Sequence, residues 1–181
     1  MSRALVSALL VLAGSSTPLH AQLRAGTAVV DITPREWPLA PQGSHFPRPV
    51  DSARDPLTVR CLVLDDGTTR IALAVVDSCM VHRDVLDPVK ESAARSTGIP
   101  TANMMIAATH THSAPFASAR YGTPQELAYQ ARLREGIAAA ITQAAADLEP
   151  ARAGWGSHDL PDEVFNRRWH LKPGTMPANP F

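Results

Sequence analysis

Two histidines separated by one threonine are the residues of this chain best suited to chemistry. His110 and His112 follow directly on the apolar stretch 104–108 and have threonine and serine beside them. Neutral imidazoles bind transition metals, zinc among them. Because side chains two residues apart on a strand point to the same side, both rings would face one ion. The spacing therefore predicts part of a metal site, and the alternative is a pair of surface or hydrogen-bonded loop histidines.

The stretch 104–108 is expected to be a buried strand that carries these histidines at its end. A run this short also suits a buried helix, but a turn-rich segment precedes it and Pro115 closes it, which favours a strand. A second apolar run, 71–76, ends at Asp77. Helical spacing of apolar residues predicts a helix between the two runs, from Asp84 to about Thr97.

The order strand, helix, strand predicts two parallel strands joined by a right-handed crossover. Asp77 and His110 would then lie at the same carboxyl edge of the sheet, where ligand sites of open α/β sheets are found. Asp77 is accordingly a candidate catalytic residue, either as a ligand or as the carboxylate that orients an imidazole. The alternative is that Asp77 caps the next helix.

The remaining elements complete an α/β fold with a mixed, largely parallel sheet and packed helices. We expect strands over 25–33 and 151–157 and a hairpin of 57–64 with 70–77 around an Asp-Gly turn. A second helix begins at Thr123 with a capping box and a proline at the first helical position. Its buried stripe is Tyr129, Leu133, Ile137, Ile141, Ala144 and Leu148.

A proline-rich segment and two cysteines add further expectations. Residues 34–56 suit neither a helix nor a central strand, so we expect a long surface loop whose part 42–45 covers a pocket or forms a disordered flap. The hairpin places Cys61 opposite Ala72 or Leu73. Cys79 is then about 20 Å away at strand rise, beyond the roughly 7 Å limit for bridged Cα atoms. Two free thiols are predicted.

The composition and the amino terminus limit the class of protein. Seventeen basic and 17 acidic residues in a chain of 181 give a formal net charge of zero, which provides no electrostatic case for nucleic-acid binding. Residues 1–21 have the charged start, apolar middle and small-residue end of a secretory signal. We therefore expect a secreted or periplasmic protein whose mature chain is 22–181.

Several motifs resemble those of the neutral, non-lysosomal ceramidases, closest to their bacterial, ceramidase-like branch. The segment 108–115, Ala-Thr-His-Thr-His-Ser-Ala-Pro, is similar to the family's Thr-His-Thr-His-Ser-Gly-Pro signature, with Ala114 in place of the glycine. Residues 25–34 look like its opening strand, 55–77 like its hairpin, and 165–168, Phe-Asn-Arg-Arg, like its Asn-Arg element. The resemblance implies that 22–181 is the N-terminal portion of a larger catalytic domain.

The same resemblance implies a zinc-dependent amide hydrolase. His110 matches a zinc ligand, His112 matches the histidine that handles substrate or protons beside the metal, and Arg167 matches the substrate-binding arginine. The remaining zinc ligands, a histidine, a glutamate and a tyrosine, are expected beyond Phe181. The implied substrate is an N-acylsphingosine, a related N-acyl lipid or another small amide, with possible peripheral contact to a membrane surface.

Two other classes of protein fit parts of the sequence. A metal-dependent amidohydrolase of the (α/β)8 type also begins with His-x-His at a strand end, and it would use further histidines such as His158 and His170. A secreted, non-enzymatic domain that binds a lipid or glycan surface would need the histidines only for structure. Zinc content and amide hydrolysis after substitution of His110 separate these classes.

Overall fold

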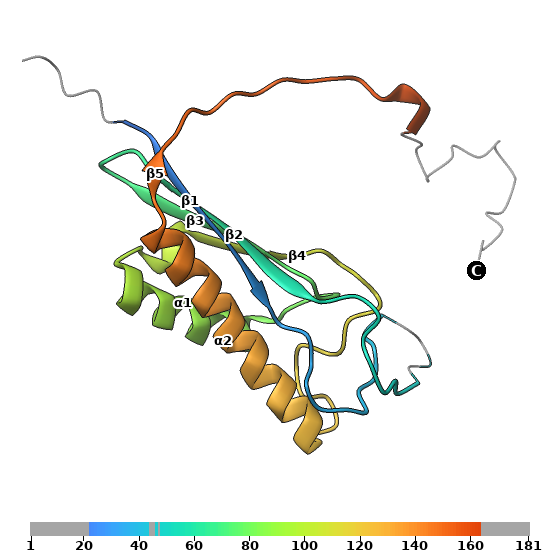
Figure 1. The fold of residues 1–181 in the computed structure, drawn as a ribbon. Coiled ribbons are helices and arrows are strands. Elements are labelled where there is room, and N and C mark those ends of the chain that lie inside the picture. The colour runs from blue at the N-terminus through green and yellow to red at the C-terminus, as the bar shows by residue number, and fades with distance from the viewer. Residues whose placement is uncertain (1–21, 44–45, 47, 164–181) are drawn as a thin grey trace, which may run out of the picture.

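A computed structural model describes residues 22–43, 46 and 48–163. In this part of the chain one five-stranded sheet has the order β4-β3-β2-β1-β5 (Figure 1). The strands are β1 (Arg24–Asp31), β2 (Thr58–Asp65), β3 (Arg70–Val76), β4 (Met104–Ala108) and β5 (Glu149–Pro150). The first strand, the hairpin and the strand before the histidines are thus confirmed.

The sheet is mixed but mostly antiparallel, so the expectation of a largely parallel sheet was wrong. The pairs β1–β2, β2–β3 and β1–β5 are antiparallel, and among the described strands only β3 and β4 run parallel. The hairpin turn forces β2 and β3 into opposite directions, whereas the helix between β3 and β4 allows the return needed for parallel pairing.

The strand expected over 151–157 is also absent from the described sheet. β5 contains two residues and pairs with the first two residues of β1, Arg24 and Ala25. Pro150 has no N–H to contribute to a ladder. The last contact is the bond from the N–H of Ala151 to the carbonyl of Leu23, at 2.8 Å. The chain then leaves the sheet (Figure 1).

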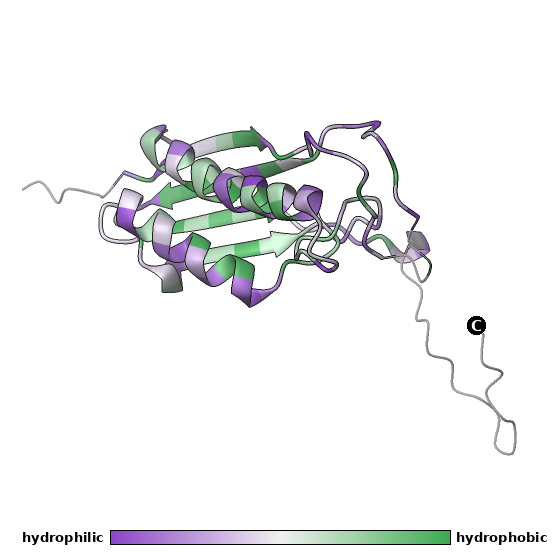
Figure 2. Cartoon of the chain, turned by 90° about the horizontal axis from the view of Figure 1, so that it is seen from below, coloured by the Kyte–Doolittle hydropathy of each residue, from purple (hydrophilic) through white to green (hydrophobic). Residues whose placement is uncertain are grey.

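Both helices lie on one face of the sheet (Figures 1 and 2). α1 (Arg83–Thr97) ends at Gly98, whose positive φ of 74° lets its N–H donate to the carbonyl of Ala94. α2 (Pro124–Ala146) begins with the predicted capping box between Thr123 and Glu126. Two short 3-10 helices, η1 (Thr101–Asn103) and η2 (Pro161–Glu163), lie outside this layer.

The core fills the space between the sheet and the two helices. Fully buried side chains come from both layers: Ile32, Val59, Val63, Val76, Val85, Tyr129, Leu133, Ile137 and Ile141. Gly26 of β1 lets this strand approach α2 closely, because a Cβ there would collide with the backbone carbonyl of Ala144. The predicted apolar stripe of α2 is therefore the surface by which this helix packs on the sheet.

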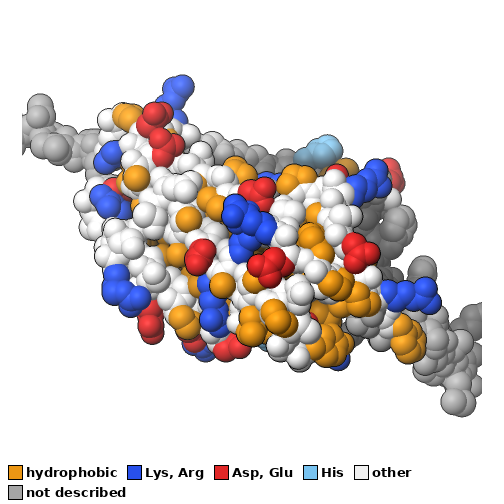
Figure 3. Space-filling model, turned by 60° about the horizontal axis from the view of Figure 1, so that its bottom comes forward, with side chains coloured by type: hydrophobic (Ala, Val, Ile, Leu, Met, Phe, Trp, Pro, Cys, Tyr) orange, Lys and Arg blue, Asp and Glu red, His pale blue; other side chains and the backbone are white. Residues whose placement is uncertain are grey.

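The two faces of the sheet differ in what lies over them and in the side chains that they expose. On the side that carries the helices, acidic and basic side chains are interspersed (Figure 3). On the other face, Val29, Val75 and Met105 remain 66%, 40% and 58% exposed. No helix in the described part of the chain has the length and apolar character needed to cross a bilayer.

The cysteines are unpaired, as predicted. Cys61 and Cys79 are both buried free thiols. Cys61 pairs in register with Ala74, one residue beyond the expected Leu73. Burial raises the pKa of the Cys61 thiol to about 11, which keeps it protonated and unreactive at neutral pH.

Candidate metal centre

The parallel pair β3–β4 brings the candidate site together. The ends of β3 and β4 meet at one edge of the sheet, where the N–H of Thr109 donates to the carbonyl of Val76 at 2.9 Å. The segments that continue from the two strands carry Cys79 and His110, 31 residues apart in sequence. The candidate site therefore lies at the carboxyl edge of the parallel pair, where the order of strand, helix and strand placed Asp77 and His110.

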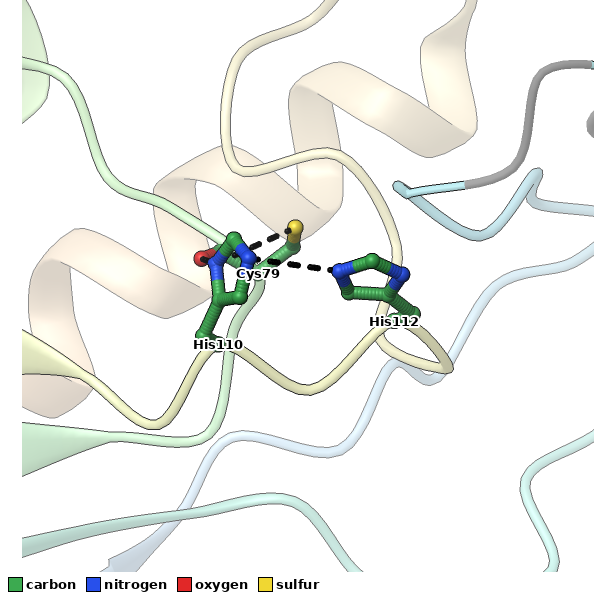
Figure 4. Close-up of side chains that lie close together, drawn as sticks. All are labelled: Cys79, His110 and His112. Atoms are coloured by element: carbon green, nitrogen blue, oxygen red, sulfur yellow. Dashed lines mark hydrogen bonds between the residues drawn. The ribbon is translucent and has the colours of Figure 1, made fainter. Parts of the chain in front are cut away.

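The two histidine rings meet as expected, but for a different reason. β4 ends at Ala108, and His110 has a positive φ of 61°, so the histidines lie in a turn and not on a continuing strand. The Nε2 atoms of His110 and His112 are 3.3 Å apart, with the rings nearly perpendicular at 79° (Figure 4). The turn, and not strand alternation, directs both Nε2 atoms into one space.

The backbone of Cys79 fixes the orientation of the first ring. Nδ1 of His110 lies 2.7 Å from the carbonyl oxygen of Cys79. Because a carbonyl only accepts, this bond places the proton on Nδ1 and leaves a lone pair on Nε2. A metal-binding histidine is commonly held in this way, with its other ring nitrogen donating to a carbonyl. The lone pair of His110 faces His112.

The separation of the two Nε2 atoms suits a metal ion such as zinc. Tetrahedral zinc with Zn–N bonds of about 2.0–2.1 Å holds neighbouring nitrogen ligands roughly 3.3–3.4 Å apart. The Nε2 atoms of His110 and His112 have this separation, 3.3 Å. An ion bound to His110 would therefore be within reach of His112. The same distance also suits one N–H···N hydrogen bond between the rings when no ion is bound.

Cys79 is the site residue that sequence reasoning missed. Its thiol lies 3.7 Å from Nδ1 of His110 and it is only 2% exposed. One ligand atom each from Cys79, His110 and His112 lie within 4.8 Å of one another (Figure 4). Its position in the sequence could have predicted this, because Cys79 follows the end of β3 just as His110 follows the end of β4.

Asp77 lies at this edge but its carboxylate is bound to β2. It accepts hydrogen bonds from the backbone N–H and the hydroxyl of Thr58, at 2.9 and 2.8 Å, and it forms an ion pair with Arg60 at 3.2 Å. The residue that caps α1 is His82, so Asp77 is not a helix cap either. The geometry does not bring Asp77 into the Cys-His-His group, and its catalytic role stays a prediction.

Other predicted site residues lie elsewhere. Arg167 and His170 fall outside the described residues, as does the expected signal segment 1–21. His158 is exposed and belongs to no group of possible metal ligands in the described part of the chain.

The proline-rich loop contacts the second histidine and the turn that follows it, and the expected cover of a pocket by 42–45 stays a prediction. The N–H of Gln42 donates to the carbonyl of Ala114 at 2.8 Å, and Pro41 bridges to Pro115. Gly43 lies directly against the ring of His112. Residues 44 and 45 of the expected cover are outside the described residues.

A pocket of about 470 Å³ opens beside His112. Its wall is largely apolar and comes from the proline-rich loop and the turn after β4, including Trp37, Val50, Leu57, Ser113 and Pro115. An apolar pocket next to a few polar groups is the usual form of a small-molecule site. The arrangement can hold an apolar group of a ligand close to the two imidazoles.

Comparisons with known proteins agree with this fold. Two solved structures match with 23% identity, each over 72% of this chain: the neutral ceramidase from Pseudomonas aeruginosa, with a TM-score of 0.60, and a ceramidase complexed with C2, with a TM-score of 0.61. This chain spans 22% of the length of each of those chains. No curated protein sequence gives a significant match.

The alternative of an (α/β)8 barrel has no support in the fold. Such a barrel needs eight parallel strands, each followed by a helix, whereas the described residues contain one parallel pair.

A family model gives the assignment. The model of the neutral/alkaline non-lysosomal ceramidase N-terminal domain matches residues 52–171, which include the Cys-His-His group and both helices. The chain belongs to the neutral/alkaline non-lysosomal ceramidase family.

Proposed function

We propose that this chain supplies part of the active site of a zinc-dependent hydrolase that cleaves the amide bond of an N-acyl lipid, such as an N-acylsphingosine. The observation that carries the proposal is the pair of Nε2 atoms 3.3 Å apart, one of them with its lone pair fixed by the carbonyl of Cys79. Family membership supports amide hydrolysis. Zinc, when bound, would lower the pKa of a water molecule and polarise the acyl carbonyl.

The two histidines have different tasks in this proposal. His110 binds the metal through Nε2 while its Nδ1–H stays on the carbonyl of Cys79. His112 is exposed and presents its Nε2 to the same space, where it can carry a proton toward the leaving amine. Gly43 limits the freedom of the His112 ring by lying against it.

The pocket beside His112 is the proposed site for the apolar part of the substrate. Trp37, Val50 and Leu57 provide an apolar wall that an acyl chain can contact, and Ser52, Arg54 and Asp55 add polar groups to the same pocket. The solved ceramidase in complex with C2 supports a ligand of this kind in the family.

Two further residues have proposed roles: Arg167 steadies substrate oxygens, and Asp77 assists catalysis. We also propose that the protein acts outside the cytoplasm and that contact with a membrane surface supplies its lipid substrate.

The experiment compares His110→Ala and His112→Gln with His158→Ala, a control at an exposed histidine outside the group. Zinc content and the hydrolysis of an N-acylsphingosine are measured on the intact protein. His110→Ala should lose both zinc and activity. His112→Gln should lower kcat by about 10²–10⁴-fold, as expected for loss of a proton-transferring group. Unchanged zinc content and rate in His110→Ala would reject the proposal and favour a non-enzymatic binding domain.

A further inference from the structure

Apolar side chains stay exposed at the end of the molecule that carries the candidate site. This end consists of the loops 32–57, 77–82 and 109–123 and the first turn of α2 (Figure 1). Figure 3 shows apolar side chains grouped toward this end on the side that the helices cover. The exposed side chains in these segments include Val50, Met80, Tyr121 and Leu127, at 41%, 46%, 60% and 53%. Exposed apolar surface that is grouped in this way marks contact with a protein, a membrane or a ligand.

An arginine is held between two aromatic rings in the loop 109–123. The guanidinium carbon of Arg120 lies 5.0 Å from the centre of the Phe116 ring and 5.5 Å from the centre of the Tyr121 ring. Both distances are within the roughly 6 Å at which an aromatic face attracts a cation. The two rings meet edge to face, with 6.4 Å between their centres. Phe116 is only 7% exposed and joins this aromatic–arginine cluster to the interior, whereas Arg120 and Tyr121 face solvent.

The backbone of the cluster is fixed to the start of α2, and its charge is positive. The N–H of Tyr121 donates to the carboxylate of Glu126 at 2.9 Å, and the same carboxylate completes the capping box. Glu126 is 5% exposed, so its negative charge is used inside the loop. With neutral histidines, Arg120 is the one charged residue between 109 and 125. The loop therefore offers one guanidinium beside exposed apolar surface and no exposed carboxylate.

We propose that the aromatic–arginine cluster and Leu127 dock this protein on a phospholipid bilayer. Arg120 contacts headgroup phosphates, because a guanidinium matches phosphate oxygens with its N–H groups. Tyr121 enters the interface, where a ring with an apolar body and a polar hydroxyl is favoured. Leu127 adds apolar area at the same depth. The inference rests on the proposed function only in taking a lipid as the substrate.

The place of the cluster beside the pocket favours a bilayer as the occupant. Phe116 follows Pro115 directly, and Pro115 lines the pocket next to His112. A lipid that leaves a bilayer at the cluster therefore has a short path to the pocket. The open face of the sheet also exposes apolar side chains, those of Val29, Val75 and Met105, but none of these three lines the pocket. That face provides the matched control positions.

The first experiment measures how the intact protein partitions onto sedimented vesicles made of equal parts phosphatidylcholine and phosphatidylglycerol. Tyr121→Ser/Leu127→Ser should lower the partition coefficient by at least about 10-fold, because two apolar side chains no longer enter the interface. Arg120→Gln should lower it by about five-fold on these anionic vesicles and by less on pure phosphatidylcholine. Met105→Ser removes a side chain that is 58% exposed on the open face, and it should bind as the unmodified protein does.

Residues 1–21 are the same in every variant, so a difference between variants reports the substituted side chains. Unmodified protein that stays off the vesicles overturns the inference. So does a double variant that binds as well as the unmodified protein, or a loss of binding in Met105→Ser that equals the loss in the double variant.

The second experiment locates the contact directly. Leu127→Cys and Met105→Cys are each labelled with a thiol-reactive dye whose emission depends on polarity, since the native thiols Cys61 and Cys79 are buried. On addition of the vesicles, the emission at position 127 should rise and shift to shorter wavelength, while that at position 105 should not change. No response at 127, or an equal response at 105, refutes docking through this end.

The vesicles contain no amide substrate, so neither readout involves hydrolysis. A protein that hydrolyses a water-soluble N-acyl amide but stays off the vesicles would overturn this inference and leave the proposed function standing. A protein that docks as described but hydrolyses no amide would contradict the proposed function alone.

Discussion

Replacing Gly43 by alanine is expected to displace the ring of His112. A Cβ at position 43 would lie 2.5 Å from Cγ, 2.8 Å from Nδ1 and 2.9 Å from Cβ of that histidine. Carbon atoms in favourable contact are about 3.5–4.0 Å apart. The ring or the loop therefore has to move by roughly 1 Å, which changes the 3.3 Å separation between the two Nε2 atoms.

The substitution has a second cost in the backbone. Gly43 has a φ of 100°, a region in which residues with a Cβ are strained by about 1–3 kcal/mol. At about 2–4 °C per kcal/mol for a chain of this size, the melting temperature should fall by several degrees. Displacement of a catalytic group by about 1 Å costs on the order of 10²-fold in rate. Stability and activity should therefore change together, by different mechanisms.

Gly98→Ala separates the two mechanisms. Gly98 also has a positive φ, 74°, but a Cβ there would meet nothing within 4 Å. Both variants should lose stability in thermal melts followed by circular dichroism, while Gly43→Ala alone should lose kcat/KM in the proposed reaction. Equal losses of activity in the two variants, or full activity in Gly43→Ala, would show that the loop does not position His112.

Three further predictions concern stability. Thr123→Ala removes the capping box of α2 and should cost about 0.5–2 kcal/mol, measured by urea unfolding; no change would mean that the cap is unimportant here. Gly26→Ala places a Cβ against a backbone carbonyl of α2, and we expect thermal melts to show a larger loss than for Thr123→Ala, because backbone cannot rotate away. The N–H of Gly67, and then Arg70, lower the pKa of Asp65. Its stabilising contribution is therefore complete above roughly pH 4 and is lost as the pH falls through the lowered pKa. Thermal melts of Asp65→Asn from pH 7 to pH 2 should show a shallower acid loss than the unmodified protein, and parallel curves would contradict this assignment.

The family relationship places the described sheet in a larger context. Val29, Val75 and Met105 leave apolar surface on the face of the sheet that the two helices do not cover. The matching solved ceramidases are several times longer than this chain, which covers 22% of each.

Much of the local structure could be predicted from the sequence because its causes are local. The capping box at Thr123 and the stripe from Tyr129 to Leu148 define α2, and the Asp-Gly turn defines the hairpin. The apolar run 104–108 and the His-x-His that follows it were sufficient to locate the candidate site. Each of these patterns depends on neighbours within a few residues along the chain.

Tertiary structure decided the direction of the strands, the geometry of the histidines and the identity of their third partner. Strand direction depends on which distant segments pair, and β1 and β5 pair across more than a hundred residues. The left-handed turn at His110 replaced the expected strand alternation. Cys79 joined the site because β3 and β4 end side by side, a contact between residues 31 positions apart that no local periodicity encodes.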